Sequence, residues 1–354
     1  MDKNSLSINQ LDCRLSHLEK STINEFKGKT ILITGGTGSI GLGLVKQLLQ
    51  CAPKAIRIFA NDENSIFETR RTIGENPLFK YMVGDVRDKE RLQLAIRNVD
   101  IVFHAAAMKH IDICEQNPFD AVKTNVLGTS NILEAAIIED VSKFIFISTD
   151  KATNPTSTLG ASKLLAERLT LDASSYNENG KTIFAIARFG NVIGSRGSVF
   201  QIFYQQIKNN IPLTVTDARM TRFIMSISEA ASMILEISHI AKDGEIFILK
   251  MPSVGIEDLA RAMIDVYKTR NPNMKKMPQL KISRTREHER FHELLATNDE
   301  LPYCYDAGHM YKISKIPNKK TISTSQFNSE SAKHISREKL HSIINELLDE
   351  YLSY

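Results

Sequence analysis

The sequence has few of the features that mark a secreted, metal-binding or membrane protein. Its four cysteines form no closely spaced pair, which argues against a metal site or a compact disulfide framework and favours reduced thiols in a cytoplasm. The first residues contain no apolar core of signal-peptide length, and no segment reaches the ~18 apolar residues of a transmembrane helix. We therefore expect a cytoplasmic protein without a metal or a membrane span.

An excess of charge of one sign is also missing. The 45 basic and 41 acidic residues leave a formal net charge of +4, which is too small to indicate nucleic-acid binding but is compatible with an anionic substrate. Hydrophobic residues make up 42% of the chain and charged residues 24%, as in ordinary globular proteins. The 354 residues suffice for one large α/β unit with a smaller appended part.

A glycine-rich loop lies between a predicted strand at 30–34 and a predicted helix at 42–49. Gly35 suits the tight turn out of the strand, Gly38 lets the backbone approach a pyrophosphate, and Gly41 lets helix and strand pack closely. The amide groups at the start of the helix then face the phosphates. This arrangement predicts a dinucleotide site.

The next predicted strand, 55–59, is followed by acidic residues. An acid about 20 residues beyond the glycine loop commonly binds the adenosine ribose, and Asp62 or Glu63 could do so. No arginine follows this strand directly, although Arg70 and Arg71 come soon after. The choice between NAD and NADP therefore stays open.

Three further positions suit the same cofactor. Asp85, after a predicted strand at 80–83, could face the adenine edge, and the small residues Ala105 and Ala106 let backbone approach a flat group. Asn125 lies inside a helix predicted over 118–139. Asparagine has poor helix propensity, so we expect a tertiary hydrogen bond to hold it there.

A polar stretch directly follows the predicted buried strand at 144–147. Ligand chemistry in α/β sheets is usually found at the carboxyl ends of the strands. Here Thr149, Asp150 and Lys151 supply a hydroxyl, an acid and an amine in consecutive positions. The following helix, predicted over 161–172, carries Lys163.

The alternation of strands and helices becomes less regular beyond a strand predicted at 182–187. The loop at 188–198 is rich in glycine and suits phosphate and sugar hydroxyls. The remaining expected features are a helix at 199–209, a strand at 213–215, a basic turn at 218–223, a helix at 228–240 capped by Ser228, a strand at 245–249, a helix at 256–267, a polar and weakly patterned segment at 307–334, and a final amphipathic helix at 336–351.

The regular βα alternation predicts an α/β fold with a Rossmann-type doubly wound parallel sheet and a smaller C-terminal substrate-binding lobe. We expect four parts along the chain. They are an N-terminal arm at 1–28 with a short helix at 11–18, a dinucleotide-binding domain at 29–195 with later strands contributing to about 250, a substrate-binding lobe at 196–306, and a C-terminal extension at 307–354 with a terminal helix.

Taken together, these motifs make the sequence resemble the extended short-chain dehydrogenase/reductase superfamily. More closely, it is similar to the nucleotide-sugar 4,6-dehydratases that act on UDP-N-acetylglucosamine in bacterial surface-glycan synthesis. The resemblance runs from about residue 26 to 300. It is carried by the motifs at 34–41, 84–88, 104–110, 123–125, 148–152, 188–198 and 220–223.

The resemblance implies a tightly bound NADP or NAD, a UDP-sugar substrate and a homo-oligomer, with no nucleic-acid partner. The residues implied at the cofactor are Gly35, Thr37, Gly38, Ser39, Ile40, Asp62, Asp85, Val86, Ala105, Ala106, Lys109, Asn125 and Lys163. Those implied at the substrate are Lys109, Asn191, Ser195, Arg196, Arg222 and Glu289.

The resemblance also implies the catalytic roles. Lys151 would remove the proton from sugar C5, Asp150 would protonate the departing C6 oxygen, Thr149 would bond the 4-hydroxyl, and Lys163 would hold the nicotinamide ribose. Lys151 must be neutral for this, and we expect burial and the nearby Lys163 or an oxidised nicotinamide to lower its pKa. Asp150 must be protonated, which burial favours.

Three positions depart from the family pattern. Leu159 stands where the superfamily has a tyrosine four residues before the lysine, although larger, membrane-anchored members of the family commonly have methionine there. Residues 288–290 read His-Glu-Arg in place of Gly-Glu-Lys, and 60–62 read Ala-Asn-Asp in place of Ser-Arg-Asp, which weakens the case for NADP. A 4-epimerase, a reductase or a silent nucleotide-sugar binder therefore stay as alternatives.

Overall fold

The computed structural model describes residues 18–177, 180–273, 278–283, 288–318, 320 and 322–352. The short helix expected at 11–18 lies, apart from its last residue, outside the described part of the chain. A helix does follow it, α1 (Lys20–Phe26).

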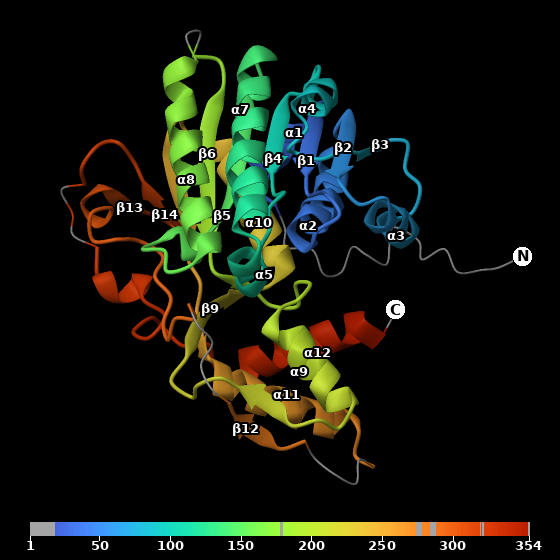
Figure 1. Cartoon of the computed structure of the whole chain (residues 1–354), viewed down its shortest axis with the longest axis vertical. Helices are drawn as coiled ribbons and strands as arrows, with labels where there is room; N and C mark the ends of the chain where they lie inside the picture. Colours follow the sequence, from blue (N-terminus) through green and yellow to red (C-terminus); the bar gives the residue numbers. More distant parts are fainter. Residues whose placement is uncertain are drawn as a thin grey trace, which may run out of the picture.

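The main sheet has nine strands and forms the upper body of the molecule in Figure 1. In spatial order they are β13 (Cys304–Ala307), β14 (Met310–Ile313), β10 (Glu245–Leu249), β6 (Ile183–Phe189), β5 (Lys143–Thr149), β4 (Ile101–His104), β1 (Thr30–Thr34), β2 (Ala55–Ala60) and β3 (Phe79–Val83). All neighbours from β10 to β3 pair in parallel, and β13 and β14 pair antiparallel. The order β3-β2-β1-β4-β5-β6 is that of a doubly wound fold, so the predicted fold class is confirmed.

Helices cover both faces of this sheet, which is why its central strands are almost continuous apolar runs. On one face lie α1, α2 (Ser39–Leu48) and α10 (Ile227–Ile240), which contact one another. On the other lie α4 (Lys89–Ile96), α7 (Gly128–Ile138) and α8 (Thr158–Asp172). Helix α3 (Glu63–Ile73) packs against β2 and β3. All residues of β1, β4 and β10 are buried.

A second, smaller core lies below the carboxyl ends of these strands (Figure 1). It is built from α9 (Val199–Lys208), α11 (Ile256–Arg270) and α12 (Arg337–Leu352). Two small sheets accompany it, β11 (Ser253–Gly255) with β9 (Thr221–Met225) and β7 (Asn191–Val192), and β12 (Leu280–Ile282) with β8 (Leu213–Val215). The apolar stripe predicted for the terminal helix buries Leu340, Ile344, Leu347 and Leu348 in this core.

The helix expected at 118–139 is confirmed as a continuous helical run, made of α6 (Pro118–Ala121), a π-helical turn at 122–127 and α7. Three local predictions are wrong. The N-cap of α10 is Ser226, which forms a capping box with Glu229, and not Ser228. The expected basic turn at 218–223 contains the start of β9, and the weakly patterned segment from 307 contains β14.

The division of the chain into four parts stays a prediction, and the topology adds one fact to it. The hairpin β13–β14 crosses the predicted boundary between 306 and 307, and it extends the main sheet beyond β10. After this hairpin the chain returns to the smaller core as α12, which packs against α11.

Candidate active site

The polar residues predicted for catalysis lie at the carboxyl end of β5. Thr149 is the last residue of the strand, and Asp150 and Lys151 belong to the 3₁₀ turn that follows. The Thr149 hydroxyl donates to Oδ1 of Asp150 over 2.8 Å, and Nζ of Lys151 donates to the same oxygen over 2.9 Å. A hydroxyl, a carboxyl and an amine therefore form one hydrogen-bonded group.

A fourth residue, which the sequence analysis did not select, completes this group. Oε1 of Glu293 lies 3.5 Å from Nζ of Lys151 and 3.6 Å from Nε of Arg222. Arg222 comes from β9, and its Nη2 lies 3.8 Å from Oε1 of Glu289. The signal in the sequence was the density of charge at 287–293, but nothing in that run shows which carboxylate reaches Lys151.

Burial has opposite effects on the acid and the amine of this group. Asp150 is fully buried, and burial raises the pKa of its carboxyl, although the ammonium group of Lys151 acts against this shift. Burial alone would lower the pKa of Lys151, but the charges of Asp150 and Glu293 outweigh it, and the net pKa lies above its usual value. The expected direction is confirmed for Asp150. For Lys151 it is wrong, because two carboxylates face its ammonium group.

Two oxygens of this group have no hydrogen-bond partner among the residues that the structure describes. They are Oδ2 of Asp150 and Oε2 of Glu293, and both are buried. Buried polar atoms in native proteins are nearly always paired, so an unpaired one is a candidate for contact with a ligand. A Cβ at Gly190 would lie 3.1 Å from Oδ2 of Asp150, so the glycine leaves room beside this oxygen.

Lys163 makes a separate set of contacts with residues near the end of β5. Its Nζ donates to the backbone oxygen of Ile147 over 2.6 Å and lies 4.0 Å from the centre of the Phe146 ring. Burial lowers the pKa of this lysine to about 7. His104, also fully buried, hydrogen-bonds Thr34, and burial lowers the pKa of its ring to about 3.

Leu159 does not contribute to the polar group. It lies in the first turn of α8, is 3% exposed, and packs in a small apolar cluster with Cys114 and Ala121. Met108 and Ile111 pack against the same cluster. The leucine is therefore explained locally by packing between α8 and the segment that contains α5 (Ile111–Gln116) and α6.

The glycine loop has the shape that a dinucleotide requires. Gly35 has φ of 65°, and a Cβ there would lie 2.8 Å from the amide nitrogen of Ala106 and 2.9 Å from the carbonyl of Ala105. A Cβ at Gly41 would lie 2.5 Å from the oxygen of Gly35. Gly38 is the N-cap of α2 and supplies no side-chain hydrogen bond to the amides at the helix start, where a pyrophosphate would fit.

A loop from the smaller core reaches this helix start. The backbone amide of Arg196 donates to Oγ of Ser39 over 3.0 Å, and Nζ of Lys109 donates to the backbone oxygen of Arg196 over 2.5 Å. Three residues implied by the resemblance are thus brought together: Ser39 at the cofactor, Arg196 at the substrate, and Lys109 at both. Ser195 directly precedes Arg196, and its amide donates to the backbone oxygen of Val192.

Several other predicted cofactor residues make contacts within the protein. The carboxylate of Asp62 accepts from the amides of Asn64 and Ser65 and so caps α3, and Thr37 bonds the hydroxyl of Ser65. Asp85 pairs with Arg87 at 2.7 Å, which holds the pKa of the carboxyl below its usual value.

The expected tertiary bond to Asn125 is confirmed. Its side chain accepts from the amide of Met108 and donates to Ser162 and to the oxygen of Met108. Val86 is 5% exposed and packs closely against Gly128, where a Cβ would lie 2.6 Å from its side chain. Ile40, the second residue of α2, packs against the main core. The cofactor roles of these residues stay predictions.

Asn191 lies on β7, and its Oδ1 has no partner within the described part of the chain. Arg188, at the start of the same motif, does not face a ligand. It is 1% exposed and pairs with Glu167 at 2.6 Å and with Glu300 at 2.8 Å. In this glycine-rich segment, Arg188 is therefore fully paired within the protein, whereas Oδ1 of Asn191 is buried without a partner in the described chain.

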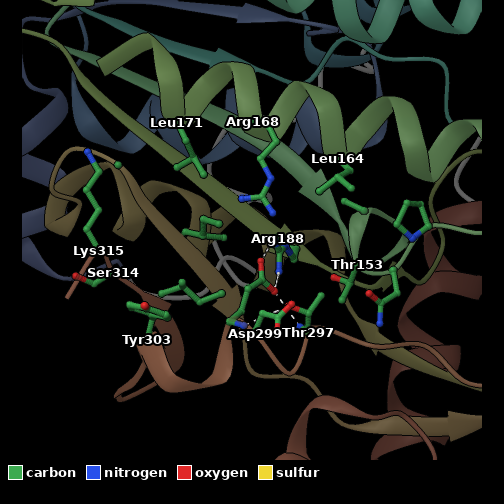
Figure 2. A pocket seen from close by; sticks show the side chains of 17 residues that line it. Thr153, Leu164, Arg168, Leu171, Arg188, Thr297, Asp299, Tyr303, Ser314 and Lys315 are labelled. Atoms are coloured by element: carbon green, nitrogen blue, oxygen red, sulfur yellow. Dashed lines mark hydrogen bonds and ion pairs between the residues drawn. The ribbon is translucent and has the colours of Figure 1, made fainter. Parts of the chain in front are cut away.

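A cavity of about 480 Å³ has Arg188 in its lining. Figure 2 shows Arg168, Arg188, Tyr303 and Lys315 around it. It borders Ala152 and the residues after it, but none of the residues that line it belongs to the glycine loop or to the Thr149–Lys151 group. The cavity is therefore distinct from the site predicted from the sequence.

Within the described residues, no cluster of three or more histidine, cysteine, aspartate or glutamate side chains has the arrangement of a metal site. Over the same residues, none of the helices combines the length and the apolar character that crossing a membrane requires.

Comparison with known proteins places these motifs in a family. The family model described as polysaccharide biosynthesis protein matches residues 31–315. An uncharacterized membrane protein of Methanocaldococcus jannaschii is 46% identical over 92% of this chain and 97% of its own length. The inverting UDP-N-acetylglucosamine 4,6-dehydratase of Campylobacter jejuni is 42% identical over 82% of this chain and 84% of its own. A UDP-glucose 4-epimerase of Rickettsia bellii is 39% identical over 81% and 83%.

Solved structures agree on the fold. The X-ray structure of Pen from Bacillus thuringiensis superposes with a TM-score of 0.85 at 39% identity, covering 91% of this chain and 98% of that one. DesIV from Streptomyces venezuelae, a dTDP-glucose 4,6-dehydratase solved with NAD bound, has a TM-score of 0.60 at 21% identity over 72% of this chain and 88% of its own. The second likeness shows the fold alone.

Proposed function

The chain belongs to the polysaccharide biosynthesis protein family, and from this premise we propose that it is a nucleotide-sugar 4,6-dehydratase. Its substrate is UDP-N-acetylglucosamine, and its product is a UDP-4-keto-6-deoxy-N-acetylhexosamine for surface glycans. The observation that carries the proposal is the buried carboxyl of Asp150, hydrogen-bonded to the partly buried amine of Lys151 at the end of β5. The relative named as a dehydratase supports it.

The glycine loop, the start of α2 and the small residues after β4 would hold NAD or NADP. Bound there, the nicotinamide supplies removal of a hydride from sugar C4 and its return at C6. The carboxylate of Asp62, which follows β2, caps α3. This contact does not distinguish NAD from NADP. The Arg196 loop lies over the start of α2 and would enclose the pyrophosphate.

One proton transfer within the site prepares both catalytic groups. Nζ of Lys151 donates to Oδ1 of Asp150 over 2.9 Å. Movement of the proton along this bond converts the charged pair into a neutral amine and a neutral carboxylic acid, which burial favours. The groups then have the protonation states that an elimination needs, although Lys151 is protonated in the resting arrangement.

The elimination returns the pair to its starting state. With a ketone at C4, the amine of Lys151 takes the C5 proton, and the electrons of that bond form the C5–C6 double bond. The C6–oxygen bond breaks as Asp150 gives its proton to the departing hydroxyl, so that water leaves. Lys151 is then an ammonium and Asp150 a carboxylate, as before.

Thr149 would handle the sugar 4-hydroxyl in this site. Its hydroxyl donates to Oδ1 of Asp150, which orients it at the end of β5, so the 4-hydroxyl would be bonded there without a phenol. Leu159 cannot serve, because its side chain is buried in the apolar cluster with Cys114. Asn191 would bind substrate hydroxyls, and its buried Oδ1, which has no hydrogen-bond partner among the described residues, supports this role.

A 4-epimerase is the second candidate, because relatives with that name are about as similar as those named dehydratases. The acid and amine pair favours the dehydratase, since an epimerase has no water to eliminate. Incubation with UDP-N-acetylglucosamine in deuterated water, followed by mass spectrometry and NMR, separates the two. Loss of one water with deuterium at C5 supports a dehydratase. An isomer of unchanged mass supports an epimerase, and no product supports a silent binder.

A cytoplasmic homo-oligomer belongs to the same proposal. Four apolar side chains near α6 to α8 are exposed in the single chain and would be covered by a second copy. They are Phe119, Val122, Leu127 and Leu165. Light scattering of the purified protein would test this part of the proposal.

A further inference from the structure

Glu293 is held in place from two sides by backbone contacts. Its amide donates to Oγ of Ser329 over 2.8 Å, and the Ser329 amide donates back to the oxygen of Glu293 over 3.0 Å. Two residues earlier, the oxygen of Phe291 accepts from the amide of Thr221 over 2.9 Å. These bonds place the carboxylate at the end of β5, far from it in sequence.

Arg222 holds the same segment, and its guanidinium N–H groups are occupied by these contacts. Its Nη1 donates to the oxygens of Thr221 and Phe291 over 2.8 and 3.1 Å, and its Nη2 donates to the oxygen of Arg290 over 2.9 Å. The side chain is buried, so Nε faces Glu293 and not solvent. The predicted substrate contact of Arg222 would require these bonds to open.

A buried second carboxylate beside Lys151 costs free energy that a packed apolar side chain would not. Oε2 of Glu293 is buried without a hydrogen-bond partner in the described chain, which adds to this cost. Lys151 and Asp150 already neutralise each other at 2.9 Å. Stability alone therefore does not explain why a charge is kept here.

Resting on the proposed dehydratase function, we propose that Glu293 is a positioning residue for Lys151. Clamped by Arg222, it fixes the Lys151 amine beside Asp150 and keeps the amine protonated until Asp150 takes the proton. The geometry on which this rests is the 3.5 Å approach of Oε1 to Nζ and the backbone bonds on both sides of Glu293.

The sign of the effect follows from the charges that face Lys151. Asp150 and Glu293 raise the pKa of its amine, while burial and Arg222 lower it. Arg290 acts on Glu293, together with Lys151 and Arg222, and helps to hold the pKa of that carboxyl below its usual value. Removal of the Glu293 charge therefore lowers the pKa of Lys151 and makes the amine neutral at lower pH.

The test measures the protonation of Lys151 without relying on turnover. Full-length protein is treated with acetic anhydride over a pH series, and acetylation of Lys151, whose side chain is 20% exposed, is quantified by peptide mass spectrometry. Only the neutral amine reacts. In Glu293→Gln the midpoint of labelling should move down by about one pH unit or more, which is tenfold in the neutral fraction.

Glu330→Gln is the matched control. Glu330 is exposed, lies 3.6 Å from the neighbouring His292, and should leave the midpoint unchanged. An unchanged midpoint in Glu293→Gln overturns the proposal. Should that variant not fold, Glu293→Asp, which keeps the charge but withdraws it from Nζ, must show a smaller shift in the same direction. No shift there overturns the proposal equally.

Turnover adds a second readout that a purely structural role would not move. In Glu293→Gln the alkaline limb of kcat/KM for UDP-N-acetylglucosamine should move to lower pH, because the proton that Lys151 shares with Asp150 is then lost at lower pH. Simple loss of structure lowers the whole profile without moving it. If the wild type fails to turn over UDP-N-acetylglucosamine, the proposed function fails. The labelling midpoint then still decides whether Glu293 controls Lys151.

Discussion

Two groups of buried charges lie at neighbouring strands of the main sheet, and they differ in how completely they are paired. At β6, Arg188 donates to both oxygens of Glu167, both oxygens of Glu300 and the backbone oxygen of Leu295. At β5, Asp150 and Glu293 share Lys151, and each keeps one buried oxygen without a partner in the described chain.

The difference separates a structural network from a candidate site. A fully paired network repays the cost of burying its charges, because it joins β6, α8 and the segment near 300. An incompletely paired network leaves buried polar atoms without partners, and a ligand can supply those partners. Both carry a cation between two carboxylates, so the residue types alone would not tell them apart.

The largest expected effect is on the unpaired group. Lys151→Met should lower turnover of UDP-N-acetylglucosamine by roughly 10²–10⁴-fold, because the elimination loses its base. Steady-state assays at one pH measure this. Lys181→Met, which removes an exposed partner of Asp140, is the control and should match the wild type. Turnover near the wild-type rate in Lys151→Met would show that the amine is not the base.

The paired group should respond in stability. Arg188→Met leaves Glu167 and Glu300 buried without their cation and should lower the free energy of unfolding by about 3–5 kcal/mol. Denaturant unfolding measures this. Arg337→Met breaks an exposed pair with Asp265 and should cost at most about 1 kcal/mol. Equal losses in the two variants would remove the distinction between the networks.

A third prediction concerns how the free energy of unfolding depends on pH through Lys163, a residue of α8. Its pKa of about 7 in the folded protein is below the unfolded value of 10.5, so its contribution to stability is present above pH 10.5 and is lost as pH falls through 7. Between pH 7 and 10, wild-type stability should rise relative to Lys163→Met by on the order of 3 kcal/mol. Unfolding curves across this window test it, and parallel pH profiles would contradict the burial argument.

The smallest effect is expected at Leu159. Leu159→Tyr overfills the cluster with Cys114 and Ala121 and should cost about 1–3 kcal/mol of stability without raising turnover. Thermal unfolding and activity assays check this. Leu94→Tyr, at an exposed position of α4, is the control and should change stability by less than about 0.5 kcal/mol. A gain in turnover in Leu159→Tyr would show that position 159 does reach the substrate.

The sheet and the polar group on β5 were predictable because they depend on short stretches of sequence. Apolar runs such as 30–34 and 144–147 specify buried parallel strands, and the glycine spacing after the first of them specifies the loop. Strand β9 was missed because Thr221 and Arg222 look like a turn, although both are buried between β7 and β11. Its extended shape is imposed by tertiary pairing.

Glu293 could not be predicted for the same reason. Its contact with Lys151 depends on bonds from Ser329 and Arg222, which lie in different elements. The net effect on the pKa of Lys151 was also out of reach, because burial and the two carboxylates act in opposite directions. The family resemblance implied roles for Asp150 and Lys151 but did not indicate the carboxylate of Glu293 beside them.

The chain path between the two cores has a consequence for dissection of the protein. The chain leaves the main sheet after β6, returns with α10 and β10, leaves again with β11 and α11, returns with the β13–β14 hairpin, and ends in the smaller core as α12. No single cut therefore releases either core intact. A fragment that ends at 195 lacks three strands of its sheet, and one that begins there carries β10, β14 and β13 without β6, the parallel neighbour of β10. We therefore expect that neither half folds as an independent module.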